Sequence, residues 1–299
     1  MFTPLSRRPF LALLTFGAVW LAAAHAADAP ALKNYFDKLE SVGVKLTRGP
    51  VTVPLKDAAE LKVPAGFAFV GEEGIEKFFE LNQNDRSGHE AGVLLAPQGW
   101  SLFFDYDPVG YVKDDEKNKL DAPKLMAAMT ANEDEINAAR RERKWEEMKI
   151  TGWATPPHYD EQTHNLKWAI NLSTSRDNFK SVFINEKIQL LGRGGVMKAV
   201  LVTDPPTFKA DEAEADKLLA ANFGYVAGQK YSEWKTGDKV AAYGLGALVL
   251  GGAGVLASKA GLFAKLGALL AAGWKVVVVA AVAMGGAVKK FWKKITGRV

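Results

Sequence analysis

Two stretches of sequence decide the fold class: residues 166–172 (LKWAINL) and 181–203 (SVFINEKIQLLGRGGVMKAVLVT). In the first, Leu166, Trp168 and Ile170 occupy alternate positions, which is typical of a half-buried β-strand. In the second, the tight turn at 192–194 separates two runs rich in β-branched and aliphatic residues. These stretches therefore predict three strands of one sheet, two of them joined directly by the turn.

Outward from this core, short apolar runs bounded by glycine and proline predict further strands and a few helices. Because the strands come in hairpins and no repeated βαβ pattern appears, we expect an α+β fold with a mostly antiparallel sheet. The expected hairpins cover 42–54, 60–70 and 92–106, and a short strand at 150–154 precedes a stiff extended turn at 155–160. The expected helices cover 27–39, 72–82, 123–148 and 211–223.

The first 26 residues have the features of a signal peptide. Arg7 and Arg8 form a basic segment, residues 10–24 are apolar, and the sequence AHA at 24–26 fits a cleavage site before Ala27. Residues 6–11 (SRRPFL) also match a twin-arginine export signal, and an ordinary secretory signal remains the alternative. In both cases we expect residues 27–238 to form an exported domain.

A membrane region is predicted after this domain. Residues 239–299 contain nine lysines and arginines and no acidic residue, and residues 240–258 carry no charge at all. A helix of 19 residues is about 28 Å long, which just spans the hydrocarbon core of a bilayer. The sequence therefore predicts a transmembrane helix at 239–258.

Residues 259–299 have two possible structures. Their lysines fall on one arc of a helical wheel, which fits a basic amphipathic helix lying on anionic lipid head groups. The long apolar runs between them also fit a second transmembrane helix in a hairpin, and the positive-inside rule favours the single span. The membrane-facing lysines are Lys265, Lys275, Lys289, Lys290, Lys293 and Lys294.

Charge and composition exclude several functions. Residues 27–238 carry 27 basic and 34 acidic side chains, so a net charge of −7 would repel nucleic acid. The chain has no cysteine, which excludes disulfides, thiolate metal sites and cysteine nucleophiles. The sequence also lacks a G-x-S-x-G nucleophile motif and a phosphate-binding loop.

The only candidate metal ligands lie close together in sequence. His158 and Asp160 would share one face of an extended chain, and His164 follows shortly after. Their spacing matches no standard metal site. The alternative is a turn in which Asp160 caps its own backbone and the histidines bind other groups. We therefore predict no cofactor, and this trio remains the weak candidate for a metal site.

Several motifs resemble those of an uncharacterised family of bacterial membrane-anchored proteins with a domain of unknown function. The resemblance implies a signal peptide, an exported domain and a C-terminal membrane region. It brings no catalytic residues, and some family members are labelled as amylopullulanase regulators. The motifs are Gly110-Tyr111-Val112, Gly152-Trp153, PPHYD at 156–160, HNLKWA at 164–169, LGRGGV at 191–196, DKVAAYG at 238–244 and GLFAK at 261–265.

These observations favour a protein of the bacterial inner membrane with its main domain in the periplasm. We expect a non-enzymatic binding, regulatory or stress-related module that contacts the lipid bilayer, anionic head groups and a protein partner. The alternative is an envelope hydrolase that cleaves polysaccharide or peptidoglycan with two carboxylates about 5–10 Å apart.

Overall fold

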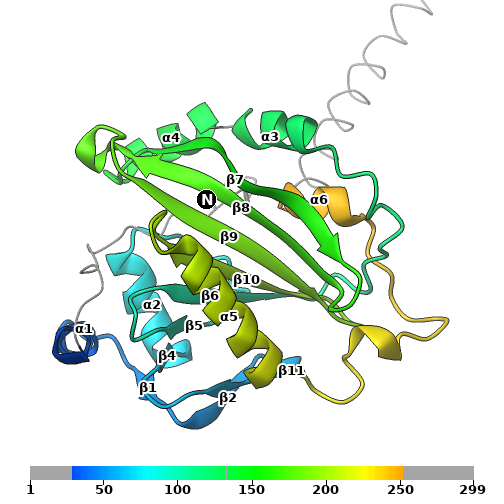
Figure 1. Cartoon of the computed structure of the whole chain (residues 1–299), viewed down its shortest axis with the longest axis horizontal. Coiled ribbons are helices and arrows are strands. Elements are labelled where there is room, and N and C mark those ends of the chain that lie inside the picture. Colours follow the sequence, from blue (N-terminus) through cyan, green and yellow to red (C-terminus); the bar gives the residue numbers. More distant parts are fainter. Residues whose placement is uncertain (1–28, 132, 252–299) are drawn as a thin grey trace, which may run out of the picture. The chain divides into compact units, whose positions relative to one another are not determined.

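The computed structural model describes residues 29–131 and 133–251, and side chains from Tyr35 onward (Figure 1). The predicted signal peptide at 1–26, the membrane-facing lysines from Lys265 to Lys294, and the second half of the predicted anchor at 239–258 lie outside these residues. The described part forms a body of two β-sheets and several helices.

The larger sheet has eight strands in the order β1-β4-β5-β6-β10-β9-β8-β7, and every neighbouring pair is antiparallel. The predicted α+β fold with a mostly antiparallel sheet is therefore confirmed. The strands are β1 (Thr47–Arg48), β4 (Ala68–Val70), β5 (Glu90–Leu95), β6 (Ser101–Asp107), β7 (Met148–Asp160), β8 (Asn165–Thr174), β9 (Val182–Leu191) and β10 (Val196–Thr203).

A smaller sheet of three strands, β11-β3-β2, lies against the larger one. Its strands are β2 (Val51–Leu55), β3 (Ala59–Val63) and β11 (Phe223–Tyr225). The helices are α1 (Ala29–Ser41), α2 (Glu72–Leu81), α3 (Ala122–Thr130), α4 (Glu133–Glu142), α5 (Phe208–Asn222) and α6 (Leu245–Val249), with 3₁₀ turns at Ser175–Asp177 and Tyr231–Glu233.

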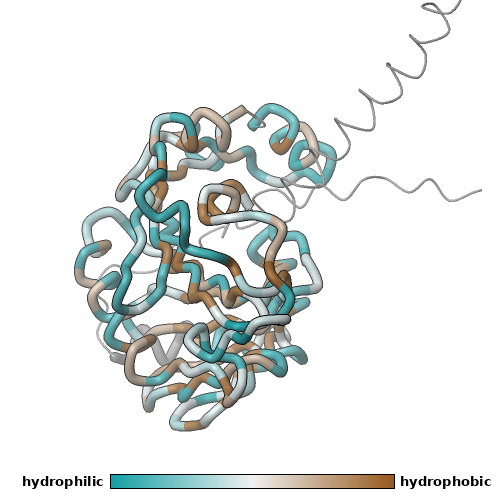
Figure 2. The backbone as a smooth tube through the Cα atoms, turned by 90° about the vertical axis from the view of Figure 1, so that its right-hand side faces the viewer, coloured by the Kyte–Doolittle hydropathy of each residue, from teal (hydrophilic) through white to brown (hydrophobic). Residues whose placement is uncertain are grey.

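The two faces of the large sheet are covered differently. Helix α5 and the small sheet pack on one face, where Leu190, Met197 and Leu218 belong to one apolar cluster (Figure 1). The opposite face, which we call the divided face, is covered by α1 and α2 on one half and by α3 and α6 on the other. In Figure 2, hydrophobic segments run through the interior and hydrophilic ones gather in the outer loops.

Most predicted elements are present, but two predicted hairpins are wrong. Strand β1 pairs with β4 in the large sheet, whereas β2 pairs with β3 in the small one, so neither pair is the expected hairpin. At Gly49 the backbone passes so close to Pro64 that an added Cβ would lie 2.0 Å from the Pro64 carbonyl oxygen. Alternation predicts a strand but leaves its partner open, and here the close approach sends consecutive strands to different sheets.

The single helix predicted over 123–148 is also wrong. The structure has two shorter helices, α3 and α4, and the second ends at Glu142. Lys144 has a φ of 58°, in the left-handed region, and Trp145 packs under the guanidinium groups of Arg140 and Arg143. This turn redirects the chain into β7, which begins at Met148 and includes the segment expected as an extended turn.

The body extends beyond Asp238, where we expected the exported domain to end. Within 239–251 the structure has only the five-residue helix α6, and its residues Leu245, Leu248 and Val249 are buried in the body's apolar core. Among the described residues, no helix is both long and apolar enough to cross a membrane. The apolar character of residues 240–250 is therefore explained by packing against the sheet.

Candidate functional site

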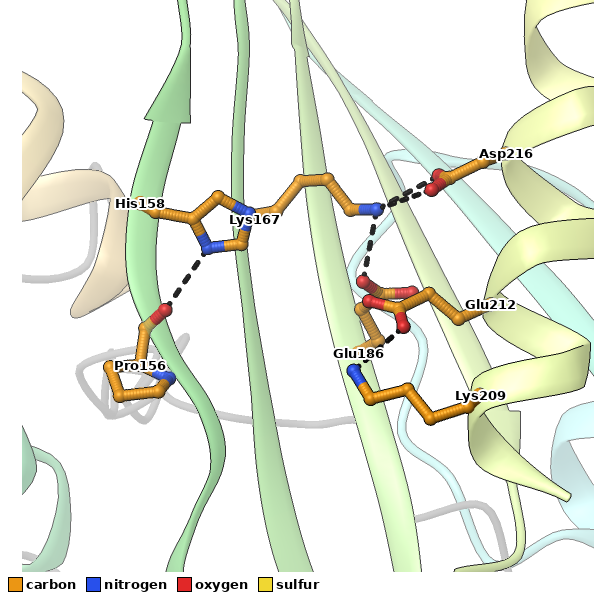
Figure 3. Close-up of polar contacts among 7 residues, drawn as sticks. All are labelled: Pro156, His158, Lys167, Glu186, Lys209, Glu212 and Asp216. Carbon is orange, nitrogen blue, oxygen red and sulfur yellow. Dashed lines mark hydrogen bonds and ion pairs between the residues drawn. The ribbon is translucent and has the colours of Figure 1, made fainter.

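The three predicted metal-ligand candidates each have other partners. His158 is exposed, and its Nδ1 lies 3.1 Å from the carbonyl oxygen of Pro156 (Figure 3). Asp160 accepts hydrogen bonds from the backbone N–H groups of Gln162 and Thr163, which holds its pKa below the usual value. In the described part of the chain, no group of three or more His, Asp or Glu side chains is arranged to hold a metal ion.

His164 lies in an aromatic cluster at the turn between β7 and β8. Its ring centre is 4.7 Å from that of Tyr231, and its Nδ1 is 3.1 Å from the hydroxyl of Tyr159. Tyr159 also donates to a carboxylate oxygen of Asp114 at 3.1 Å. Tyr111 stacks on Tyr231 with 4.4 Å between ring centres, so the cluster joins three distant parts of the chain.

Part of this cluster belongs to residues 226–250, which we call the C-terminal strap. The strap crosses the body and is hydrogen-bonded along its length. Tyr111 donates its backbone N–H to Lys239 at 2.8 Å and accepts one from Ala241 at 2.9 Å. Arg193 binds both carboxylate oxygens of Asp238 at 2.7 Å. The strap is thus fixed to the body before α6 begins.

Most motifs that carry the family resemblance meet at this strap. Gly110 lies against it so closely that an added Cβ would be 2.5 Å from the carbonyl oxygen of Lys239. Gly192 and Gly194 bring the β9–β10 turn against Gln229 and Tyr225. The motif at 238–244 is part of the strap. The motifs at 110–112, 156–160, 164–169 and 191–196 are distant from it in sequence, and each contributes a residue to the cluster or turn that holds the strap.

A charged network lies between the large sheet and α5 (Figure 3). Lys167 on β8 forms ion pairs with Glu186 on β9 at 3.1 Å and with Asp216 on α5 at 2.8 Å. Next to them, Glu212 on α5 pairs with Lys209 at 2.8 Å. The side chains of Glu186 and Lys167 are 1% and 11% exposed, so this network is largely shielded from water.

Burial and charge oppose each other in this network. Burial lowers the pKa of Lys167, but the charges of Glu186 and Asp216 outweigh it and raise that pKa overall. Burial raises the pKa of Glu186 to about 7 despite the nearby ammonium group. Since Lys167 stays charged and bridges two carboxylates, the network pins α5 to the sheet and has a structural role.

On the divided face, a row of polar side chains crosses the centre of the large sheet. Glu90, Asp105, Lys198 and Gln189 occupy directly opposite positions on β5, β6, β10 and β9. Cross-strand partners have Cβ atoms about 4.5–5.5 Å apart, so each side chain starts beside the next one. We call these four residues the polar row.

Two members of the polar row are tied to neighbouring groups. Glu90 accepts hydrogen bonds from the backbone N–H groups of Ser87 and Gly88 and lies 3.7 Å from Arg86. Lys198 pairs with Asp107 at 2.9 Å. The acid at one end therefore anchors the loop before β5, and the lysine is neutralised by Asp107.

Asp105 is different from its neighbours in the row. It is 5% exposed, and its Oδ1 has no hydrogen-bond partner in the described structure. Burial raises the pKa of Asp105 to about 7, with Glu90 adding to the effect and Lys198 opposing it. A carboxyl group with such a pKa can give or take a proton near neutral pH.

The polar row was not predicted from the sequence. The only candidate site residues predicted in the body were His158, Asp160 and His164, which are close together in sequence. A signal was present in the sequence, because polar residues are unexpected in strands that are buried on both faces. Such residues interrupt otherwise apolar strands at Asp105, Lys187, Gln189 and Lys198. The row itself could not be read from the sequence because it depends on the registers of β5, β6, β9 and β10.

Comparisons with known proteins give a family but no activity. The model of a family described as "Protein of unknown function (DUF2167)" matches residues 47–285. Cyanobacterial PsbP (CyanoP) from Synechocystis sp. PCC 6803 is a similar solved structure, with 14% identity, a TM-score of 0.35, and coverage of 61% of this chain and 93% of that one. The Ran-binding protein Mog1p from Saccharomyces cerevisiae has 10% identity, a TM-score of 0.29, and coverage of 63% and 100%. No curated protein matches the chain.

Proposed function

The chain belongs to the DUF2167 family of proteins of unknown function. We propose that it is a membrane-anchored envelope protein. Its body would lie in the periplasm, its tail would contact the inner membrane, and it would act as a non-enzymatic binding or regulatory module. Both ends of the sequence support this proposal: a signal-like segment precedes the body, and a basic apolar segment follows it.

The observation that carries the proposal is the fixation of the strap. Arg193 holds it at Asp238 and Tyr111 holds it at Lys239 and Ala241, and α6 packs into the core as far as Val249. Residues 252–299 therefore follow a segment that is already part of the body, without a free linker before it. A membrane contact made by this tail would hold the body close to the bilayer.

Charge supports the same arrangement. The tail from 239 carries nine basic and no acidic residues, whereas residues 27–238 have a net charge of −7. Anionic head groups attract clustered lysines and repel an acidic surface. The lysines of the tail would therefore contact the anionic head groups, and the acidic body would not.

Phosphatase fusions test the topology. A fusion after Gly251 should be active, because alkaline phosphatase folds only after export. A fusion after Val299 should be inactive if residues 252–299 cross the membrane once, and active if they form a hairpin. An inactive fusion after Gly251 would overturn the periplasmic location, and release of the full chain by salt alone would overturn anchoring.

In-cell crosslinking followed by mass spectrometry tests the binding role. The body should give reproducible crosslinks to a small set of envelope proteins. A variant with Arg193→Gln and Asp238→Asn, which frees the strap, should alter that set. If the wild type and the variant both formed crosslinks simply in proportion to the abundance of each envelope protein, a specific binding role would be contradicted.

A second candidate, an envelope hydrolase, is favoured by one observation. Glu90 and Asp105 are directly opposite each other, and the raised pKa of Asp105, about 7, suits a general acid. Against it, the oxygens of Glu90 are engaged by the loop at 86–88. Release of sugars or peptides from purified peptidoglycan, lost in Asp105→Asn, would establish the hydrolase; no release by the wild type would exclude this activity.

A further inference from the structure

Lys187 stands apart from the other lysines on the large sheet. It lies on β9, directly opposite Trp168 on β8 and Val200 on β10, and on the same face as Gln189 of the polar row. Both flanking residues are buried, with 1% and 2% exposure, whereas Lys187 is partly exposed. Its amine therefore stands between apolar walls in a place that solvent still reaches.

The ammonium group of Lys187 is not neutralised by a direct partner. Within residues 29–131 and 133–251 it forms no hydrogen bond or ion pair, whereas Lys167 pairs with two carboxylates and Lys198 with one. Burial lowers the pKa of Lys187 to about 8, and the positive charge of Lys198 adds to this effect. A lysine in an apolar site beside another cation is the arrangement that makes an amine nucleophilic near neutral pH.

Three polar atoms without partners lie on the same face of the sheet as this amine. Oδ1 of Asp105, Oε1 of Gln189 and Nε1 of Trp168 are buried and have no hydrogen-bond partner in the described structure. Each unsatisfied buried group costs about 1–3 kcal/mol, so three on one face indicate a place for water or a small polar molecule. The charge of Asp105 also reaches Lys187, because it opposes the lowering of that lysine's pKa.

We propose that Lys187 is a nucleophilic lysine that forms an imine with a small aldehyde or ketone, and that Asp105 transfers the proton. This activity goes beyond the proposed anchoring and binding role. The neutral Nζ attacks the carbonyl carbon, the π electrons move to oxygen, and the protonated Asp105 gives its proton to that oxygen. The attacking nitrogen then returns one proton to the Asp105 carboxylate, which leaves a neutral carbinolamine. Asp105 next protonates the hydroxyl, which departs as water while the nitrogen lone pair forms the C=N bond, and the remaining N–H proton goes back to the carboxylate. Amine and carbonyl thus give imine and water without any oxidant, and Asp105 ends protonated as it began.

The neighbouring groups suit this chemistry. The attacking nitrogen must be neutral, and its apolar neighbours Trp168 and Val200 disfavour the charged form. The carbinolamine hydroxyl needs an acceptor, which Gln189 Oε1 offers from two residues along the same strand. Lys198 cannot replace Lys187 because its ammonium is held by Asp107 at 2.9 Å.

Reductive trapping on the wild-type chain tests the proposal without any variant. The full chain is incubated at pH 7 with glycolaldehyde and sodium cyanoborohydride, and the adduct on each lysine is quantified by peptide mass spectrometry. Lys187 should be labelled about 10- to 100-fold faster than the exposed Lys62, because far more of its amine is neutral at this pH. Equal rates at the two lysines would overturn the proposal.

Two variants separate the roles. Lys187→Arg should lose the fast adduct while Lys62 keeps its rate. Asp105→Asn removes a negative charge that favours the ammonium form of Lys187. If Asp105 acted on Lys187 only through this charge, Lys187 would therefore be labelled faster in the variant. A proton-transfer role predicts the opposite, a several-fold slower rate at Lys187 with Lys62 unchanged. An unchanged or faster rate would overturn the role of Asp105.

Discussion

Arg193 donates two parallel hydrogen bonds to Asp238, from Nε to Oδ2 and from Nη2 to Oδ1, each 2.7 Å long. Arg193 belongs to the turn between β9 and β10, and Asp238 belongs to the strap, 45 residues later. Bidentate pairs of this kind fix orientation as well as distance. The pair therefore sets where the strap crosses the sheet, just before the segment that enters the core as α6.

Replacing Arg193 by glutamine should loosen the strap while the sheet stays folded. Glutamine cannot supply two parallel donors to a carboxylate, so amides at 228–241 should exchange with solvent roughly tenfold faster. Hydrogen exchange read by mass spectrometry measures this change. Arg141→Gln is the matched control, because the exposed Arg141 binds Glu147 by a single contact and lies far from the strap in sequence. Equal exchange in both variants would contradict the role of the pair.

Acid should open the same strap in the wild-type protein. The hydrogen bond from Arg193 is the largest of several effects that hold the pKa of Asp238 at about 2. Because the folded pKa lies below the unfolded value of about 3.9, the stabilisation is present above pH 4 and disappears as the pH falls towards 2. The protection of amides at 228–241, relative to their intrinsic exchange rate at each pH, should therefore fall between pH 4 and pH 2, and this step should be absent in Asp238→Asn.

Gly110 should not tolerate alanine. Its φ is 96°, and an added Cβ would lie 2.5 Å from the carbonyl oxygen of Lys239 in the strap. Strain and displacement of the strap should lower the free energy of unfolding by about 1–3 kcal/mol in urea titrations. Gly224→Ala is the control, since an added Cβ there has no atom within 4 Å. Similar losses in the two variants would show that close packing at Gly110 is unimportant.

Local patterns predicted the centre of the fold well. Alternating side chains gave β8, and the glycine turn at 192–194 gave the β9–β10 pair, because both signals depend only on neighbouring residues. The sheet to which β2 and β3 belong was not predictable, since it depends on the contact of Gly49 with Pro64. Two strands that flank a turn can pair with each other or with strands elsewhere in the chain. The alternation of apolar and polar residues along each strand is the same in both cases.

The strap and the polar row show two further features that local sequence patterns could not predict. The apolar residues at 240–250 have the composition of either a membrane segment or a buried core segment, and periodicity does not separate these. Their packing as α6 follows from contacts made by Tyr111 and Arg193, which precede them by more than 40 residues. Likewise, Asp105 and Lys198 become neighbours only when β6 pairs with β10.

Replacing Lys167 by methionine should strongly destabilise the body. The change leaves Glu186, 1% exposed, without its cation, and an unpaired buried charge costs about 3–5 kcal/mol. Chemical denaturation at pH 8 measures the loss, because Glu186, with a pKa of about 7 beside Lys167, is mostly ionised in the wild type at this pH. Adding Glu186→Leu should recover much of it, since two apolar side chains can fill the same space. No recovery in the double variant would show that the lysine acts through Asp216 instead.

Burial of Asp105 should make the stability of the protein fall as the pH rises, which is unusual for a carboxyl group. Its folded pKa of about 7 exceeds the unfolded value of about 3.9, so the folded state holds a proton that the unfolded state releases between these values. This contribution to the free energy of unfolding is present below pH 4 and falls as the pH rises to 7. With about 1.4 kcal/mol for each pH unit, the loss could reach about 4 kcal/mol.

Asparagine at position 105 resembles the protonated carboxyl group and does not titrate. The Asp105→Asn variant should therefore match the wild type near pH 4 and exceed its stability at pH 8, by up to about 4 kcal/mol. Urea unfolding at the two pH values measures the difference. Asp177→Asn is a suitable control because this partly exposed residue has a lowered pKa, which gives an effect of opposite sign. If Asp105→Asn were less stable than the wild type at pH 8, the buried carboxyl would have to be ionised and paired, and the basis for its role as a proton donor to Lys187 would be removed.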